Sequence, residues 1–213
     1  MHTTAISPMR AYCVYAGTFA ATKRKKTTMI AKDFIGKYRE SKSFEFEKFI
    51  SFDNPTKIEK YGVWSDPKQP FRKEIVDELM SDFSKNDLLL IRKLMQSSIK
   101  ATRQDSVSDG TLTDLAFMLF YFGELEDVKL IYESKFHSCW DSMCSGYRDM
   151  LTMNRGKNEV ISYVRKNNIE EKGIYSNQQI LQEVEFAFDE PDYDTKEKFM
   201  EFIYGYYGKA IKK

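Results

Sequence analysis

The stretch Asp109–Cys144, DGTLTDLAFMLFYFGELEDVKLIYESKFHSCWDSMC, contains the densest apolar run of the chain and decides its predicted fold. Between Thr111 and Phe122 apolar residues occupy almost every side of a helix, which is typical of a helix buried in the centre of a protein. Gly123 follows and predicts a helix stop, because glycine adopts the left-handed conformation at little cost. A second, amphipathic helix is expected next, since acidic residues favour a helix N-terminus; these are Glu124, Glu126 and Asp127.

The end of this stretch gathers His137, Cys139 and Cys144 within eight residues. Structural zinc usually needs four ligands, and the only other His and Cys are His2 and Cys13, far away in the sequence. We therefore predict no metal and no cofactor. A Cys–His enzyme is the less favoured alternative, because neighbours on one turn rarely form a cleft for a nucleophile and its base.

A structural role is the favoured interpretation of the same turn. Asp141 is placed to cap the helix that follows it, and free cysteines commonly pack as small buried hydrophobes. We accordingly predict that Cys139, Trp140 and Cys144 pack at the helix junction, with Gly123 as the stop before it. The chain also lacks a P-loop, a dinucleotide-binding glycine motif and a zinc-protease motif.

Outside this stretch, apolar residues recur mainly at spacings of three and four, which predicts further helices. Ser84 or Asn86 could cap one of them, and the two prolines of Trp64–Phe71 predict an extended connection and a possible subregion break at 64–71. The predicted helical segments are Phe34–Tyr38, Phe46–Ile50, a single turn at Ile58–Tyr61, Arg72–Phe83, Leu88–Ile99, Met143–Leu151, Val160–Val164, Ile180–Phe188 and Phe199–Tyr206.

This pattern predicts an all-α fold. Helices of about 10 to 20 residues joined by short loops are typical of antiparallel hairpins stacked as an α-α superhelix. We expect an arrangement of the HEAT or tetratricopeptide kind with degenerate repeats, since no regular repeat period is visible. With 213 residues and 42% apolar composition, the chain is expected to form one helical domain over residues 33–213.

Residues 1–32 form a basic leader that carries six basic residues and no acidic one. We expect a disordered tail or an upstream extension before a start at Met29; an organellar transit peptide is a less favoured interpretation. The run Lys23–Lys26 is weak support for nucleic-acid binding, since no aromatic residues are interleaved with it. Three cysteines do not make a disulfide framework, so we expect a cytoplasmic protein. No apolar run approaches a membrane span.

Two acidic stretches predict the kind of partner. Residues 105–127 contain six acidic residues and no basic one, and residues 176–201 contain eight acidic against two basic residues. Acidic groups with aromatic neighbours suit the binding of a basic protein, although such runs are commonly only a solvated face. The predicted contact residues are Glu183, Asp189, Asp192, Tyr193 and Asp194, with Glu124, Glu126 and Asp127 of the first stretch.

Over about residues 88–165 the chain resembles a family of small bacterial helical proteins. The resemblance depends on Gly123–Lys135 and on Trp140–Cys144, and the departures are Tyr132 for a family Trp, Trp140 for a Phe and Ser145 for a Gly. It implies a non-enzymatic helical-repeat protein, and by analogy at fold level an immunity partner of a secreted toxin.

The functional hypothesis is therefore a non-enzymatic protein-binding module, and in its specific form an immunity protein. It would neutralise a basic toxin, such as a nuclease, by covering it with an acidic surface. A generic helical-repeat adaptor is the alternative. The sequence predicts no oligomeric state.

Overall fold

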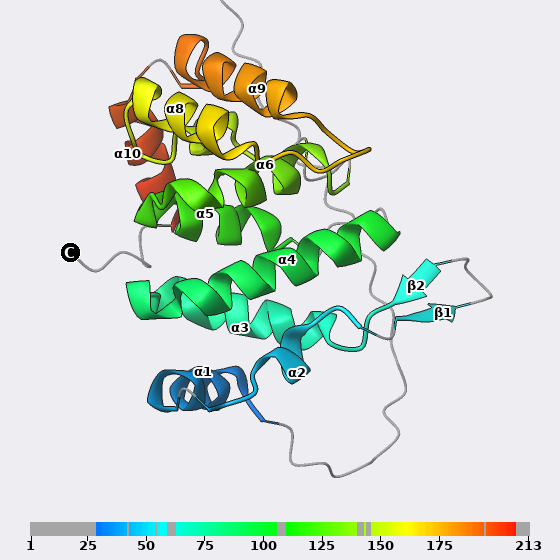
Figure 1. The fold of residues 1–213 in the computed structure, drawn as a ribbon. Coiled ribbons are helices and arrows are strands. Elements are labelled where there is room, and N and C mark those ends of the chain that lie inside the picture. Colours follow the sequence, from blue (N-terminus) through cyan, green and yellow to red (C-terminus); the bar gives the residue numbers. More distant parts are fainter. Residues whose placement is uncertain are drawn as a thin grey trace, which may run out of the picture.

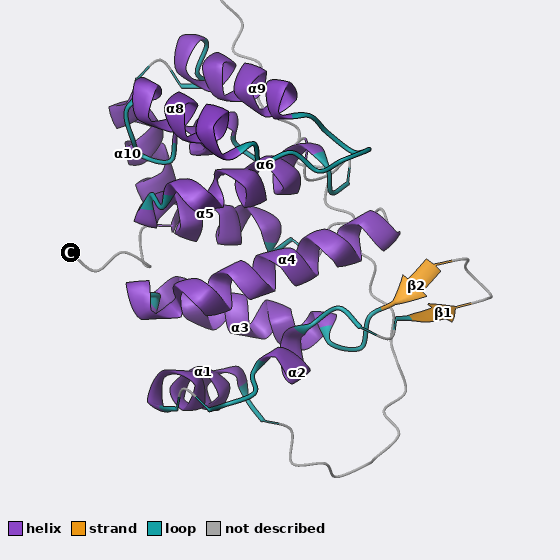
Figure 2. Cartoon of the chain, viewed as in Figure 1, coloured by secondary structure: helices purple, strands orange, loops and turns teal. Residues whose placement is uncertain are grey.

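The computed structural model describes residues 29–41, 43–53, 55–58, 63–105, 110–139, 143, 146–193 and 195–207. Helices make up most of this part of the chain (Figure 1), and its only paired strands form one short hairpin (Figure 2). The all-α prediction is confirmed. Most of the basic leader, residues 1–28, lies outside the described residues, as do Trp140, Asp141, Cys144 and Asp194.

The elements follow one another with short connections. In order they are α1 (Ala31–Glu40), α2 (Glu47–Ile50), β1 (Thr56–Ile58), β2 (Val63–Ser65), α3 (Gln69–Asp82), η1 (Lys85–Asp87), α4 (Leu88–Asp105), α5 (Leu112–Phe122), η2 (Leu125–Asp127), α6 (Val128–Phe136), η3 (Arg148–Thr152), α8 (Lys157–Asn167), α9 (Asn177–Asp189) and α10 (Lys196–Tyr207). None of the described helices is long and apolar enough to cross a membrane.

Helix α5 is the centre of the core, as its apolar sequence predicts. Seven of its eleven residues are buried, among them Phe117 and Phe120 with no exposed surface. Gly123 ends the helix in the left-handed region with φ +64°, and its N–H donates to the carbonyl of Leu119 at 3.1 Å. The predicted glycine stop is confirmed.

The helices are stacked in layers that follow the order of the sequence (Figure 1). Helix α1 packs on α3, α4 on α5 and α6, and α8 on α9. Helix α10 returns to α5, where the rings of Phe120 and Phe199 meet edge to face with centroids 5.5 Å apart. Buried residues from Ala31 to Ile203 form one contiguous hydrophobic core.

The predicted helical turn at Ile58–Tyr61 is wrong where the structure describes it. Thr56–Ile58 is strand β1, which pairs antiparallel with Val63–Ser65, so that Lys57 lies opposite Trp64. Three residues on each side are too few for a clear alternation of apolar and polar residues, and the pairing partner supplies the hydrogen bonds that a helical turn would have made internally.

The extended connection predicted for Trp64–Phe71 is only half correct. Residues 64 and 65 are extended in β2, but α3 already begins at Gln69. Pro70 occupies the first turn of α3, where its missing N–H costs nothing, because the first helical N–H groups have no intrahelical acceptor.

The predicted helix Met143–Leu151 is only partly correct: Met143 is helical, but Arg148–Thr152 forms the short 3₁₀ helix η3. Met153 and Asn154 then adopt positive φ values of 51° and 52°, so the chain leaves the helical conformation between the two predicted segments Met143–Leu151 and Val160–Val164. The turn lies against the end of α5, because Arg155 Nε donates to the carbonyl of Gly123 at 2.8 Å. This contact joins the central helix to the C-terminal layers.

Candidate functional site

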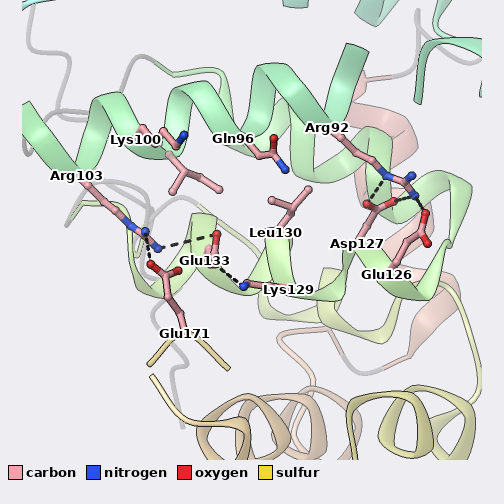
Figure 3. Close-up of a pocket in the computed structure, with 11 residues that line it drawn as sticks. Arg92, Gln96, Lys100, Arg103, Glu126, Asp127, Lys129, Leu130, Glu133 and Glu171 are labelled. Atoms are coloured by element: carbon pink, nitrogen blue, oxygen red, sulfur yellow. Dashed lines mark hydrogen bonds and ion pairs between the residues drawn. The ribbon is translucent and has the colours of Figure 1, made fainter. Parts of the chain in front are cut away.

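A groove with a volume of about 560 Å³ lies between α4 and α6 and is open to solvent (Figure 3). On α4, the lining residues recur at the helical spacing of three to four residues, with Ile99 and Lys100 adjacent in the same turn. Helix α6 and the preceding turn supply the opposite wall. The lining residues are Arg92, Gln96, Ile99, Lys100, Arg103, Glu126, Asp127, Lys129, Leu130, Glu133 and Glu171.

One end of the groove is closed by a tight ion pair. Arg92 donates from Nε and Nη2 to the two carboxylate oxygens of Asp127 at 2.6 and 2.9 Å, and Nη2 also contacts Glu126. Burial raises the pKa of Asp127, although Arg92 favours its charged form. The side chain of Asp127 is only 1% exposed. It therefore holds α4 to α6 and is not available to a partner, which corrects its predicted contact role.

At the other end of the groove the cationic side chains make only long contacts with the carboxylates. Arg103 Nε donates to the carbonyl of His137 at 2.5 Å, but Nη1 lies 3.5 Å from Glu171 and Nη2 lies 3.9 Å from Glu133. Arg103 Nη2 is buried and has no hydrogen-bond partner. Lys129 Nζ is likewise 3.8 Å from Glu133. These cations are near carboxylates without being saturated by them.

Glu133 is the buried titratable group of this end. Burial raises its pKa, and the hydroxyl of Tyr175 donates to its carboxylate. Burial also raises the pKa of Tyr175, and the negative charge of Glu133 adds to that effect. Burial acts to raise the pKa of Glu171 as well, but the hydrogen bond with Glu133 and the charges of Arg103 and Lys129 outweigh it, so the pKa of Glu171 is lowered. The pKa values of the two carboxyl groups are therefore shifted in opposite directions, that of Glu133 upwards and that of Glu171 downwards.

His137 and Cys139, two residues of the less favoured Cys–His alternative, pack against neighbouring side chains. His137 Nε2 is 3.3 Å from the hydroxyl of Tyr132, and its ring centroid is 4.8 Å from that of Tyr175. Burial lowers the pKa of His137. Cys139 is a free thiol with 8% exposure. Within the described ranges no group of three or more His, Cys, Asp or Glu residues could hold a metal ion.

Most of the predicted contact acids form internal ion pairs. Glu183 accepts from Arg148 Nε at 2.9 Å, Asp189 pairs with Lys157, and Glu124 pairs with Lys85 at 2.5 Å. Asp192 accepts the backbone N–H of Arg148 at 3.1 Å. These interactions neutralise many of the carboxylates that we predicted, from the sequence, to contact a partner. They could not be read from the sequence, because the partners lie about 30 to 45 residues away.

Within the second acidic stretch, the exposed carboxylates without a described partner are Glu190, Glu197 and Glu201. They lie at the C-terminal end of α9 and on α10, and Glu197 and Glu201 share one face because they are four residues apart. We name these three residues the acidic edge. The sequence analysis included these three residues in an acidic stretch but predicted neighbouring residues as the partner contacts. Only the exposure and the ion pairs seen in the structure distinguish the three from those neighbours.

Next to Glu190 lies a pocket of about 190 Å³, lined by Asp149, Thr152, Arg155, Ala187, Phe188, Pro191, Tyr193, Thr195 and Phe199. Tyr193, a predicted contact residue, packs its ring 4.8 Å from Phe202 and 5.4 Å from Phe199. Asp149 accepts the backbone N–H groups of Asp192 and Tyr193 at 2.9 and 3.2 Å, which fixes the loop at the mouth of the pocket.

Comparisons of the chain with protein-family models, with curated proteins and with solved structures find no match.

Proposed function

We propose that this protein is a non-enzymatic binding protein that docks a basic protein on the acidic edge. In its specific form the proposal is an immunity protein that neutralises a basic toxin, such as a nuclease, by covering its active surface. The observation that carries the proposal is the set of three exposed carboxylates, Glu190, Glu197 and Glu201, which have no ion pair in the described part of the chain.

The charge around the edge supports a basic partner. Residues 189–201 contain six acidic and two basic residues, a net charge of −4. Glu190 is also the C-terminal cap residue of α9, where the helix dipole adds negative potential. Carboxylates that are already paired gain little from a new cation, whereas unpaired ones can steer a basic protein and raise its association rate.

The neighbouring pocket supports a docking site with an anchor. An engineered cavity of about 150 Å³ accommodates benzene, so the pocket of about 190 Å³ beside Tyr193 has room for an aromatic or aliphatic side chain. Interfaces derive most of their affinity from a few such buried anchors, surrounded by polar contacts. Apolar filling of this pocket and charge pairing at the neighbouring Glu190 would act together.

The proposal also includes the way in which the helices are stacked and the cellular location of the protein. Helical hairpins stacked as an α-α superhelix would present α9 at one end of the stack, with α10 packed back along the side towards α5, and the layer order in Figure 1 supports this arrangement. We place the protein in the cytoplasm because three cysteines in 213 residues do not form a disulfide framework.

The test compares three forms of the full-length chain. The edge variant carries Glu190→Lys, Glu197→Lys and Glu201→Lys. The matched control carries Glu40→Lys, Glu74→Lys and Glu78→Lys on α1 and α3, which are exposed glutamates without a described ion pair, so the net charge changes equally. Proteins captured from the native host on each form are identified by mass spectrometry, and each captured protein is then purified for kinetics.

We expect a basic protein to be captured by the wild type and the control but lost from the edge variant. Its association rate with the edge variant should fall by about 10-fold or more at low salt, because steering depends on these charges. Identical captured sets, or captured proteins that are not basic, would contradict the proposal. Capture of several unrelated proteins by the wild type would favour the generic adaptor.

A further inference from the structure

We propose that the groove between α4 and α6 is a second binding site, which takes an extended peptide segment and holds one of its carboxylates between Lys100, Arg103 and Lys129. This site is separate from the acidic edge, since none of its lining residues belongs to α9 or α10. The proposed docking of a basic protein on the acidic edge assigns this groove no role.

The two ends of the groove differ in charge. At the closed end Arg92 faces both Glu126 and Asp127, which leaves a net charge of −1 (Figure 3). At the open end Lys100, Arg103 and Lys129 face Glu133 and Glu171, which leaves a net charge of +1. An anionic group is therefore attracted to the open end and repelled from the closed one.

Unused hydrogen-bonding capacity marks the position of that anion. Arg103 Nη2 is buried without a hydrogen-bond partner, and a buried donor without an acceptor is destabilising. Lys100 lies one turn earlier on the same face of α4, is exposed, and has no ion pair within the described ranges. A carboxylate in the groove can accept from the exposed Lys100, while the guanidinium of Arg103 beneath it adds positive charge, and charge-assisted hydrogen bonds are among the stronger ones.

The dimensions and the floor of the groove favour a peptide over a free ion. From Arg92 to Arg103 helix α4 rises about 16 Å, which matches roughly five residues of extended chain. Ile99 and Leu130 form an apolar floor with 2% and 9% exposure, which suits an apolar side chain next to the carboxylate. The chain's own leader is not the expected occupant, because residues 1–32 contain no acidic residue.

The experiment selects peptides from a random library displayed on phage, with the full-length protein as bait. Selected peptides are synthesised with a fluorescent label, together with analogues in which each Asp or Glu is replaced by Asn or Gln. Binding is measured by fluorescence anisotropy to the wild type and to Lys100→Glu, with Lys166→Glu on α8 as the matched control. Gln96→Trp, which fills the groove, is compared with Gln182→Trp on α9; all four positions are exposed.

We expect the selected peptides to share an acidic residue. Neutralising it, or introducing Lys100→Glu, should weaken binding by about 5-fold or more, in line with the coupling energies of close charge pairs. Lys166→Glu and Gln182→Trp should bind as the wild type does, and Gln96→Trp should abolish binding. Peptides without acidic residues, or affinities that Gln96→Trp and Lys100→Glu leave unchanged, would overturn the inference, as would a selection that enriches no peptide. Because none of these variants alters the acidic edge, either proposal can fail while the other stands.

Discussion

The left-handed turn at Gly123 gives the sharpest quantitative prediction. A Cβ added to Gly123 would lie 2.8 Å from the carbonyl oxygen of Met153 and 3.3 Å from Arg155 Nε. Real Cβ atoms do not approach a backbone oxygen that closely, so Gly123→Ala must displace the turn that joins α5 to the C-terminal layers. The backbone conformation itself, at φ +64°, adds a second penalty.

The two penalties can be estimated separately. Placing a residue with a Cβ in the left-handed region costs about 1–2 kcal/mol. Forcing extra volume into a packed site costs about 1–3 kcal/mol. Gly123→Ala should therefore lower the free energy of unfolding by about 2–5 kcal/mol, a large part of the stability of an ordinary domain.

Two further glycines isolate these contributions. Gly173 has φ +83° but open space where an added Cβ would lie, so Gly173→Ala should show the backbone penalty alone, about 1–2 kcal/mol. Gly36 lies inside α1 with no positive φ, and an added Cβ would have no neighbour within 4 Å. Gly36→Ala should stabilise the protein by about 0.5–1 kcal/mol, because alanine favours the helix.

Urea unfolding followed by circular dichroism at 222 nm measures all three variants under one condition. The expected order of stability is Gly36→Ala, wild type, Gly173→Ala and then Gly123→Ala. If Gly123→Ala were no less stable than Gly173→Ala, the close approach of Met153 would not constrain the turn, and the reasoning would be refuted.

Three other predictions concern buried polar groups and caps. Arg72 Nη2 lies 2.5 Å from Asp66 Oδ2 with both side chains buried, so Arg72→Met should cost about 3–5 kcal/mol in urea unfolding, and combining it with Asp66→Asn should recover part of the loss. The raised pKa of Glu133 means that the folded state binds the proton of this carboxyl group more tightly than the unfolded state does. The contribution of Glu133 to the free energy of unfolding therefore falls as the pH rises from the ordinary pKa of a glutamate through the raised one. Glu133→Gln should flatten that part of the stability–pH curve, and an unchanged slope would exclude Glu133 as its cause. Ser176 accepts from the N–H of Gln179 in a capping box, so Ser176→Ala should lower stability by about 1 kcal/mol, and no measurable loss would show that the cap is dispensable.

Periodicity along the chain predicted the helices because a helix is a local structure. The apolar run of α5, its stop at Gly123 and the break before α8 all depend on residues close together in sequence. The strand pair was not predicted, because each strand has only three residues and its hydrogen bonds are made with the other strand rather than with neighbours in sequence. The extended connection predicted around Pro70 was partly wrong, because proline is tolerated in the first turn of a helix.

The candidate sites were much less visible from the sequence. Arg92 and Asp127 are 35 residues apart and Arg103 and Glu171 are 68 apart, yet each pair meets across the groove. No spacing rule connects such residues, so neither the groove nor its loosely held cations could be predicted. The acidic stretches were recognisable, but which carboxylates are already paired depends on contacts between distant elements.

Composition and apolar spacing thus determined that this chain is helical, that α5 lies at its centre and that acidic residues gather towards its C-terminal end. Tertiary structure decided which charges remain exposed. Glu183 and Asp189 are neutralised by Arg148 and Lys157, whereas Glu190 is left free within the described part of the chain. The physical reason is that helix formation depends on neighbours in sequence, while the pairing of charges depends on which helices pack together.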